Sequence, residues 1–263
     1  MNESKEVERS LVVIGGGSGI GAEVVRKTLA SGYHVQVIDR DIDAARRVAM
    51  SLGEHVTVWA ADVMDELILA EVHTEIEAKH PPIMGLVNCA GSRPVRKCIE
   101  DYPTDEWEAN LVSHLRSTYV ACRVFGSAMA RRGAGSIVNF ASVLAFRSGP
   151  VLDYGPAKAG VASLTESLAV HWAGRGVRVN AVAPGWTDTP FLRSPAGQPL
   201  RDFGAIVDAV PVGRLLQPAE VADVVLFLLS PAAGAVTGVV VPCDGGYLAG
   251  TGWHAYGGVP HDK

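Results

Sequence analysis

Cysteines and basic clusters are scarce in this 263-residue chain, and long apolar runs are absent. Its four cysteines are scattered and have no histidine ladder nearby, so we expect no disulfide framework, no metal site and a reducing, cytoplasmic setting. The net charge is −5 and the basic pairs are too short to form a patch, which argues against nucleic-acid binding. No run has the length of a bilayer span, and the polar N-terminal stretch lacks the apolar core of an export signal. These absences predict a soluble protein.

What the sequence does contain is a regular alternation of short apolar runs and longer helical patterns. Continuous β-branched runs are typical of strands buried on both faces. Seven such runs lie at 10–15, 34–39, 55–62, 83–91, 135–142, 177–185 and 238–246. Amphipathic segments of helical length lie between them at 20–31, 65–79, 105–131 and 155–173. Because right-handed crossovers place helices on both faces, the pattern predicts one α/β domain over residues 1–263, with a Rossmann-type doubly wound, seven-stranded parallel sheet.

Two segments interrupt this alternation. Four prolines break the pattern between residues 186 and 217, and an irregular insertion of that length is more typical of a lid or binding loop than of a linker. The tail, residues 248–263, carries Trp253 and Tyr256 among glycines and is too apolar for an idle terminus. We therefore expect a substrate lid at 186–217 and a tail that packs on another subunit.

A glycine cluster follows the first predicted strand and opens a helix. Gly15, Gly19 and Gly21 have the spacing G-x-x-x-G-x-G. Glycines allow a sharp turn and a close approach of the backbone to a pyrophosphate, and the amides of the helix N-terminus then face the phosphates. A tight turn uses glycines too, but the position between a strand and a helix favours a dinucleotide site.

Asp39 ends the second predicted strand, 18 residues beyond Gly21. A carboxylate at this place can accept hydrogen bonds from both ribose hydroxyls of an adenosine, and it repels a 2′-phosphate. NAD is therefore favoured over NADP as the cofactor. The neighbouring Arg40 keeps NADP open, because a guanidinium pairs well with phosphate.

A tyrosine and a lysine meet near the start of the helix predicted at 155–173. Tyr154 and Lys158 are four residues apart and so share one helix face, and Pro156 is tolerated in a first turn. A cation about 4 Å from the phenolate oxygen stabilises the phenolate by on the order of 4 kcal/mol at an effective dielectric near 20. That is roughly the energy needed to bring a phenol from a pKa of about 10 toward neutrality. The pair therefore predicts a tyrosine with a lowered pKa, suited to proton transfer.

These ordered motifs resemble the compact single-domain branch of the short-chain dehydrogenase/reductase family, from about Leu11 to Tyr247. The family's nucleotide loop is similar to residues 15–21, although Ile14 stands where threonine is usual, and its Asn-Asn-Ala-Gly segment is similar to residues 88–91, with Cys89 as the second residue. With Asp39 and Arg40, the resemblance implies the following cofactor contacts: Gly15, Gly17, Ser18, Gly19, Ile20, Asp39, Arg40, Asp62, Val63, Asn88, Ala90, Gly91, Tyr154, Lys158, Pro184, Gly185, Thr187 and Thr189.

The resemblance also implies a catalytic tetrad, made of Asn110, Ser142, Tyr154 and Lys158. Tyr154 would exchange a proton with the substrate oxygen, which Ser142 would hold, while Lys158 would also reach the nicotinamide ribose. Asn110 would position a water that links Lys158 to solvent. The segment between Ser142 and Tyr154 is one residue shorter than is common. The implied activity is the NAD-dependent interconversion of a secondary alcohol and a ketone.

Two other functions stay open. A nucleotide-binding sensor or scaffold could keep this fold without turnover, and a serine hydrolase is compatible with the fold class but lacks the nucleophile elbow. His114 and His171 have no partners at ligand spacing, and we interpret them as packing or surface residues.

The substrate should lie beneath the segment 186–217. Apolar side chains there would form a wall, namely Trp186, Phe191 and Leu192. Three arginines could bind an anionic substrate group or simply be surface residues: Arg147, Arg193 and Arg201. From the family resemblance we expect a homotetramer, paired through the helices near 105–131 and 152–173.

Overall fold

The sheet has seven parallel strands in the order β3-β2-β1-β4-β5-β6-β7. The computed structural model describes residues 9–193 and 202–258. Its strands are β1 (Ser10–Ile14), β2 (His34–Asp39), β3 (Val56–Ala60), β4 (Ile83–Asn88), β5 (Gly135–Phe140), β6 (Val177–Pro184) and β7 (Val240–Cys243). All seven predicted strands and the Rossmann-type doubly wound sheet are confirmed.

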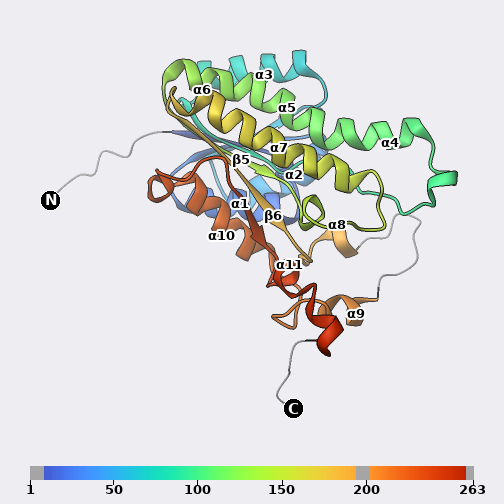
Figure 1. Ribbon diagram of the computed structural model, residues 1–263. Coiled ribbons are helices and arrows are strands. Elements are labelled where there is room, and N and C mark those ends of the chain that lie inside the picture. The colour runs from blue at the N-terminus through green and yellow to red at the C-terminus, as the bar shows by residue number, and fades with distance from the viewer. Residues whose placement is uncertain (1–8, 194–201, 259–263) are drawn as a thin grey trace.

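Helices cover both faces of this sheet (Figure 1). In chain order they are α1 (Gly19–Ala30), α2 (Ile42–Met50), α3 (Glu66–Lys79), α4 (Thr104–Leu111), α5 (Ser117–Ala121), α6 (Ser127–Arg132), α7 (Tyr154–Ala173), α8 (Pro190–Arg193), α9 (Phe203–Asp208), α10 (Pro218–Leu229) and α11 (Tyr247–Gly250). Helices α1, α2 and α10 pack on one face, and α3, the α4 to α6 region and α7 pack on the other.

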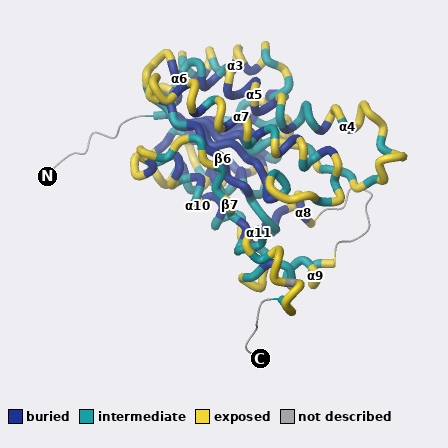
Figure 2. Tube along the Cα trace, in the orientation of Figure 1, coloured by how far each residue is buried: buried dark blue, intermediate teal, exposed yellow. Residues whose placement is uncertain are grey.

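Two apolar cores lie on either side of the strands because successive strand residues point to opposite faces. In β1, Leu11 and Val13 join one core while Val12 and Ile14 join the other. Every residue of this strand is buried. Figure 2 shows the buried sheet at the centre, with most exposed residues on the outer helix surfaces, the turns and the tail. The continuous apolar strands of the sequence are therefore explained by burial on both faces.

The predicted helix 105–131 is not a regular α-helix. Two π-helical turns, at Val112–Arg116 and Cys122–Gly126, separate α4 from α5 and α5 from α6. A π turn contains more residues than an α turn, so it rotates the side chains that follow around the helix axis. The first π turn carries His114, which is buried.

Helix α7 (Tyr154–Ala173) begins one residue before the predicted segment 155–173. Asp153 caps it: one carboxylate oxygen accepts from the Tyr154 backbone N–H at 2.7 Å, and the other accepts from the Tyr102 hydroxyl at 2.5 Å. Lys158 follows one turn later and is buried. The cap therefore fixes the residue at which the helix begins, and with it the position of Tyr154 and Lys158 in the first two turns.

The segment 186–217 leaves the sheet after β6 and is closed at its base. The Leu216 N–H donates to the Trp186 carbonyl at 2.9 Å, and the Asp188 N–H donates to the Leu216 carbonyl at 2.8 Å. Helices α8 and α9 lie within this segment and gather with α11 at one end of the molecule (Figure 1). Within the two described ranges, no helix is both long and apolar enough to cross a membrane.

Candidate active site

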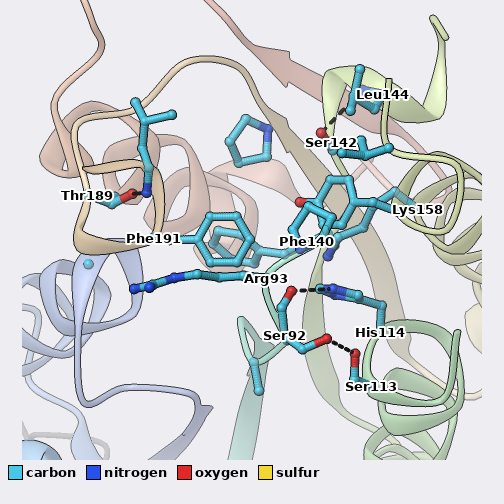
Figure 3. A pocket seen from close by; sticks show the side chains of 18 of the residues that line it. Ser92, Arg93, Ser113, His114, Phe140, Ser142, Leu144, Lys158, Thr189 and Phe191 are labelled. Carbon is cyan, nitrogen blue, oxygen red and sulfur yellow. Dashed lines mark hydrogen bonds between the residues drawn. The ribbon is translucent and has the colours of Figure 1, made fainter. Parts of the chain in front are cut away.

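A cavity of about 1740 Å³ opens at the carboxyl ends of the strands. Residues that follow β1, β2, β4, β5 and β6 line it, together with residues of α7 and α8 (Figure 3). Strand order reverses between β1 and β4, and ligands of doubly wound sheets bind where such a reversal leaves a crevice. The predicted cofactor and substrate residues can therefore be compared with the residues that line this cavity.

The glycine loop forms one side of this cavity. Gly15 has a φ of +80°, and a Cβ there would lie 2.7 Å from the Ala90 backbone nitrogen, so only glycine fits. A Cβ at Gly21 would lie 2.1 Å from the Gly15 carbonyl oxygen. Among the described residues, no side chain caps the N-terminus of α1 at Ser18, which leaves its first amides available to an anion. This loop fits the phosphates of a dinucleotide.

Two carboxylates lie where the adenosine end of a dinucleotide would extend. Asp39 lines the cavity at the end of β2, and it accepts hydrogen bonds from the N–H groups of Gly17 at 2.9 Å and Asp41 at 3.0 Å. Asp62 lines the cavity after β3 and accepts from the Met64 N–H at 2.9 Å. Backbone amides thus hold both carboxylates in place as acceptors toward the cavity.

Ser142 and Lys158 lie together on one side of the cavity (Figure 3), and Tyr154 lines the same cavity. Lys158 is 5% exposed, and its ammonium donates to the Phe140 carbonyl at 2.6 Å and lies 5.4 Å from the centre of the Tyr154 ring. Ser142 is buried at the start of the turn after β5, and its side chain hydrogen-bonds to Tyr154. A hydroxyl, a phenol and an ammonium therefore meet within one pocket.

The expected lowering of the Tyr154 pKa by Lys158 is wrong for this structure. Burial raises the pKa of Tyr154 to about 12, against the opposing effect of the hydrogen bond with Ser142. Burial also lowers the pKa of Lys158 to about 8. Both shifts have the same main cause, since a charged form is disfavoured away from water.

Three predicted site residues do not line the described cavity wall. The Gly17 amide turns to Asp39. Asn88 points into the core, where its amide donates to the Asn139 side-chain oxygen at 2.8 Å. Asn110 donates to the Ser92 hydroxyl at 3.4 Å behind that wall. Asn110 thus lies off the cavity wall, whereas His114, in the π turn that follows it, lines the cavity.

His114 is the main cavity residue whose place the sequence interpretation missed. It is 2% exposed, lines the cavity and hydrogen-bonds through Nε2 to the Ser92 carbonyl at 2.9 Å. Its ring meets the Tyr154 ring edge-on, with centres 5.0 Å apart and planes at 88°. Burial, with a smaller contribution from the Lys158 charge, holds its pKa well below the usual range. The sequence shows that His114 lies four residues after Asn110, but it does not show the π turn that contains His114.

The substrate side of the cavity has apolar and cationic walls. Trp186, Phe191 and Leu192 line it, as expected. Arg147 and Arg193 are not on the described wall: Arg147 donates to the Phe146 carbonyl, and Arg193 forms an ion pair with Asp188. Arg201 lies outside the described residues.

Other cations occupy the wall in their place, namely Arg93, Arg96 and Lys97. Figure 3 shows Arg93 extending alongside Phe191, toward the segment that carries Thr189. Its guanidinium donates to the Pro190 carbonyl at 3.0 Å, which connects the loop after β4 to the start of α8. Arg93, Arg96 and Lys97 begin two residues after Gly91 in the sequence. That closeness to a predicted cofactor residue was the sequence signal that could have placed these cations at the cavity.

Comparison with known proteins places this site among oxidoreductases. The family described as enoyl-(acyl carrier protein) reductase matches residues 15–248. Galactitol 2-dehydrogenase (L-tagatose-forming) of Cereibacter sphaeroides is 40% identical over 245 residues, which cover 89% of this chain and 93% of that protein. Cis-4-hydroxycyclohexanecarboxylate dehydrogenase of Sinomonas cyclohexanicum is 37% identical over 92% of this chain and 97% of its own.

Solved structures share this fold over nearly the whole chain. A structure described as ribose-5-phosphate isomerase from Brucella melitensis 16M is 42% identical, with a TM-score of 0.92 over 97% of this chain and 98% of that one. The ElxO structure with NADP bound is 28% identical, with a TM-score of 0.85 over 92% and 99% of the two chains. The 3-ketoacyl-(acyl-carrier-protein) reductase of Brucella melitensis, complexed with NADH, is 30% identical, with a TM-score of 0.83 over 92% and 98%. Both kinds of nicotinamide dinucleotide thus occur among similar structures.

Proposed function

The chain belongs to the short-chain dehydrogenase/reductase family, and on that premise we propose that it is an NAD(H)-dependent oxidoreductase interconverting a secondary alcohol and a ketone. One observation supports this most strongly: Ser142, Tyr154 and Lys158 line the same cavity as the glycine loop. The two relatives described above are dehydrogenases by name, of a polyol and of a cyclic hydroxy acid.

The three side chains divide the work of alcohol oxidation. Ser142 holds the substrate oxygen by a hydrogen bond, and Tyr154 takes the hydroxyl proton as the carbon loses its hydride. A bound oxidised nicotinamide supplies the hydride acceptor and a positive charge that favours the phenolate. Lys158, fixed by the Phe140 carbonyl, adds a second positive charge beside the phenol. In the reverse direction Tyr154 donates the proton to the developing alkoxide.

NAD is the proposed cofactor rather than NADP. Asp39 presents a carboxylate to the cavity where a 2′-phosphate would be, and backbone amides hold it there. Arg40 also lines the cavity, but it cannot remove the charge of Asp39. Gly15, Ser18, Gly19 and Ile20 on the glycine loop are the proposed phosphate contacts.

The remaining proposed cofactor contacts also line the cavity: Asp62, Val63, Ala90, Gly91, Pro184, Gly185, Thr187 and Thr189. The substrate is proposed to be a small polar secondary alcohol, held between the apolar wall of α8 and the cations Arg93, Arg96 and Lys97. The segment 186–217 is its proposed lid.

A nucleotide-binding protein without turnover is the second candidate, and the position of Asn110 behind the cavity wall favours it. Such a protein would bind NADH and convert no carbonyl compound. An isomerase acting on ribose 5-phosphate would need no nucleotide, and a coupled assay without nucleotide would detect it.

The deciding experiment is a substrate panel that follows the absorbance of the reduced cofactor, with NAD and NADP in parallel. The panel includes galactitol and cis-4-hydroxycyclohexanecarboxylate. We expect NAD-dependent turnover that Tyr154→Phe reduces by about 10² to 10⁴ in kcat, the usual contribution of a general acid or base. NADH binding, measured by fluorescence, should survive the substitution. Turnover by Tyr154→Phe near the wild-type rate would remove the proposed role of the phenol.

A homotetramer is the proposed assembly. Residues of the α4 to α7 region form an apolar groove of about 360 Å³, lined by Leu111, Val112, Leu115, Arg116, Tyr119 and Leu164. In the tail, Trp253 is 53% exposed and Tyr256 is 92% exposed. Light scattering of the full chain should give four copies, and deletion of residues 251–263 should lower the assembly state if the tail packs on another subunit.

A further inference from the structure

His114 has a fixed ring orientation and a defined tautomer. Its Nε2 lies 2.9 Å from the Ser92 carbonyl oxygen, which can only accept, so Nε2 carries the proton. The Ser92 hydroxyl is itself held by the Ser113 hydroxyl at 2.6 Å. Figure 3 shows both contacts at the edge of the cavity. The geometry therefore leaves Nδ1 of the neutral ring as a hydrogen-bond acceptor.

That acceptor is buried, and no described residue bonds to it. An unsatisfied buried acceptor costs free energy, so the position calls for a donor that comes from outside the protein chain. Burial and the nearby Lys158 charge both keep the ring from taking a second proton. His114 thus remains an acceptor rather than becoming an acid.

The side chains around His114 are those proposed to move the proton. Its ring edge packs on Tyr154, and the Lys158 charge acts on it. Cys89 is the other titratable group that interacts with both Tyr154 and Lys158, and burial raises the pKa of its thiol to about 12. A thiol of that kind stays protonated and does not replace His114 as an acceptor.

We propose that His114 is a positioning residue that connects Lys158 to solvent: Nδ1 accepts a hydrogen bond from a water molecule that also contacts the Lys158 ammonium, while the ring edge holds the Tyr154 phenol. The family resemblance implies this role, the positioning of a water between Lys158 and solvent, for Asn110. The assignment to His114 rests on the proposed function. Each alcohol oxidation leaves one proton at the Tyr154 oxygen, while the hydride leaves separately to the nicotinamide. The Lys158 ammonium gives a proton to the held water, which passes it to solvent, and the proton left at the Tyr154 oxygen restores the ammonium, while His114 stays neutral throughout.

Two substitutions separate the hydrogen-bond acceptor of His114 from the packing of its ring against Tyr154. His114→Phe keeps a ring edge against Tyr154 but has no acceptor, whereas His114→Gln keeps an acceptor oxygen. We expect His114→Phe to lower kcat at least about tenfold and to move the pH profile of kcat to higher pH, with KM changed less than about threefold. His114→Gln should restore most of kcat. The exposed His171→Gln is the control for the loss of a histidine.

Asn110→Leu tests the alternative that Asn110 positions the water. We expect this substitution to lower kcat less than His114→Phe does. The proposal fails if His114→Phe matches the wild type in both kcat and pH profile. It also fails if His114→Phe and His114→Gln lose kcat equally and in step with their melting temperatures, because that result would mean a purely structural role.

A measurement without turnover tests the tautomer directly. Nitrogen-15 NMR of the histidine rings should show a neutral ring with Nε2–H from about pH 6 to 9, at a signal that disappears in His114→Gln. A charged ring, or a proton on Nδ1, would overturn the relay and leave the proposed function untouched. Absence of wild-type turnover on the whole substrate panel would overturn the proposed function and the relay together.

Discussion

The imidazole of His114 fills the space that a side chain at Gly91 would need. A Cβ built on Gly91 would lie 2.1 Å from Cε1 and 2.3 Å from Nδ1 of that ring. Gly91 does not have a positive φ, so the requirement for glycine is steric and not conformational. The loop after β4 and the π turn after α4 are therefore fitted to one another at the wall of the cavity.

Gly91→Ala should displace the His114 ring and weaken its bond to Ser92. Overpacking of this kind costs about 1–3 kcal/mol of unfolding free energy. In a His114→Ala background the added methyl group has room, so the same substitution should cost much less. A double-mutant cycle by urea unfolding measures this coupling, and strictly additive costs would contradict the steric account.

Asp39→Asn should reduce the preference for NAD over NADP. The amide keeps an oxygen for the Gly17 N–H but removes the negative charge that faces a 2′-phosphate. We expect the ratio of kcat/KM for NAD to that for NADP to fall by about tenfold or more, since one charge repulsion at contact distance exceeds 1.4 kcal/mol at an intermediate dielectric. Parallel steady-state assays with both nucleotides give the ratio.

Asp43→Asn is the matched control for Asp39→Asn, because Asp43 is exposed on α2 and pairs with Arg46. It removes the same charge outside the cavity wall. If Asp39→Asn and Asp43→Asn shift the ratio equally, the effect comes from net charge and the carboxylate of Asp39 does not select the cofactor.

The parts of the site with a local signature were predictable from the sequence. Gly15 and Gly19 do lie at positive φ at the end of the first strand, and Tyr154 does begin a helix with Lys158 one turn on. Such features depend on residues close in the chain, whose backbone preferences and helical spacing are known in advance. The seven strands were predictable for a similar reason, because burial on both faces leaves a continuous apolar run.

The parts that depend on helix irregularity and burial were not predictable. Asn110 and His114 are both on the helix before α5, and which of them faces the cavity is decided by a π turn that no local residue pattern announces. The pKa of Tyr154 is raised and not lowered because desolvation depends on the packed surroundings, which the Tyr154 to Lys158 spacing does not report.

Arg93→Met should loosen the start of α8 over the cavity. The substitution removes the hydrogen bond to the Pro190 carbonyl, a contact between two segments that both line the substrate side. A bond of this type contributes about 0.5–1.5 kcal/mol, so KM for the alcohol should rise up to about tenfold, with a smaller change in kcat.

Arg147→Met is the control for Arg93→Met, since that guanidinium donates to the adjacent Phe146 carbonyl and does not line the described cavity wall. Initial-rate kinetics of both variants with the best alcohol of the panel make the comparison. A KM unchanged in Arg93→Met would mean that the contact with Pro190 does not hold α8 during binding.

Lys158 should make the folded protein more stable, relative to Lys158→Met, as the pH rises from about 8 to 10.5. Burial lowers the pKa of Lys158 to about 8 from an ordinary 10.5. Below pH 8 both folded and unfolded chains hold the proton, and between the two values only the unfolded chain does. Stability rises with pH wherever the unfolded state binds more protons, so the wild type should gain up to about 3 kcal/mol over the variant.

Urea unfolding of both proteins from pH 7 to 10.5 measures this difference. The hydrogen bond that Lys158→Met loses to the Phe140 carbonyl shifts the difference by a constant, so only its slope reports the proton. Tyr154 and Cys122 are present in both proteins, and their raised pKa values lower stability at alkaline pH in both, which cancels in the subtraction. The exposed Lys79→Met controls for replacing a lysine by methionine. A difference that stays flat would mean that Lys158 keeps its proton when folded, and the proton route from Tyr154 would then need another first acceptor.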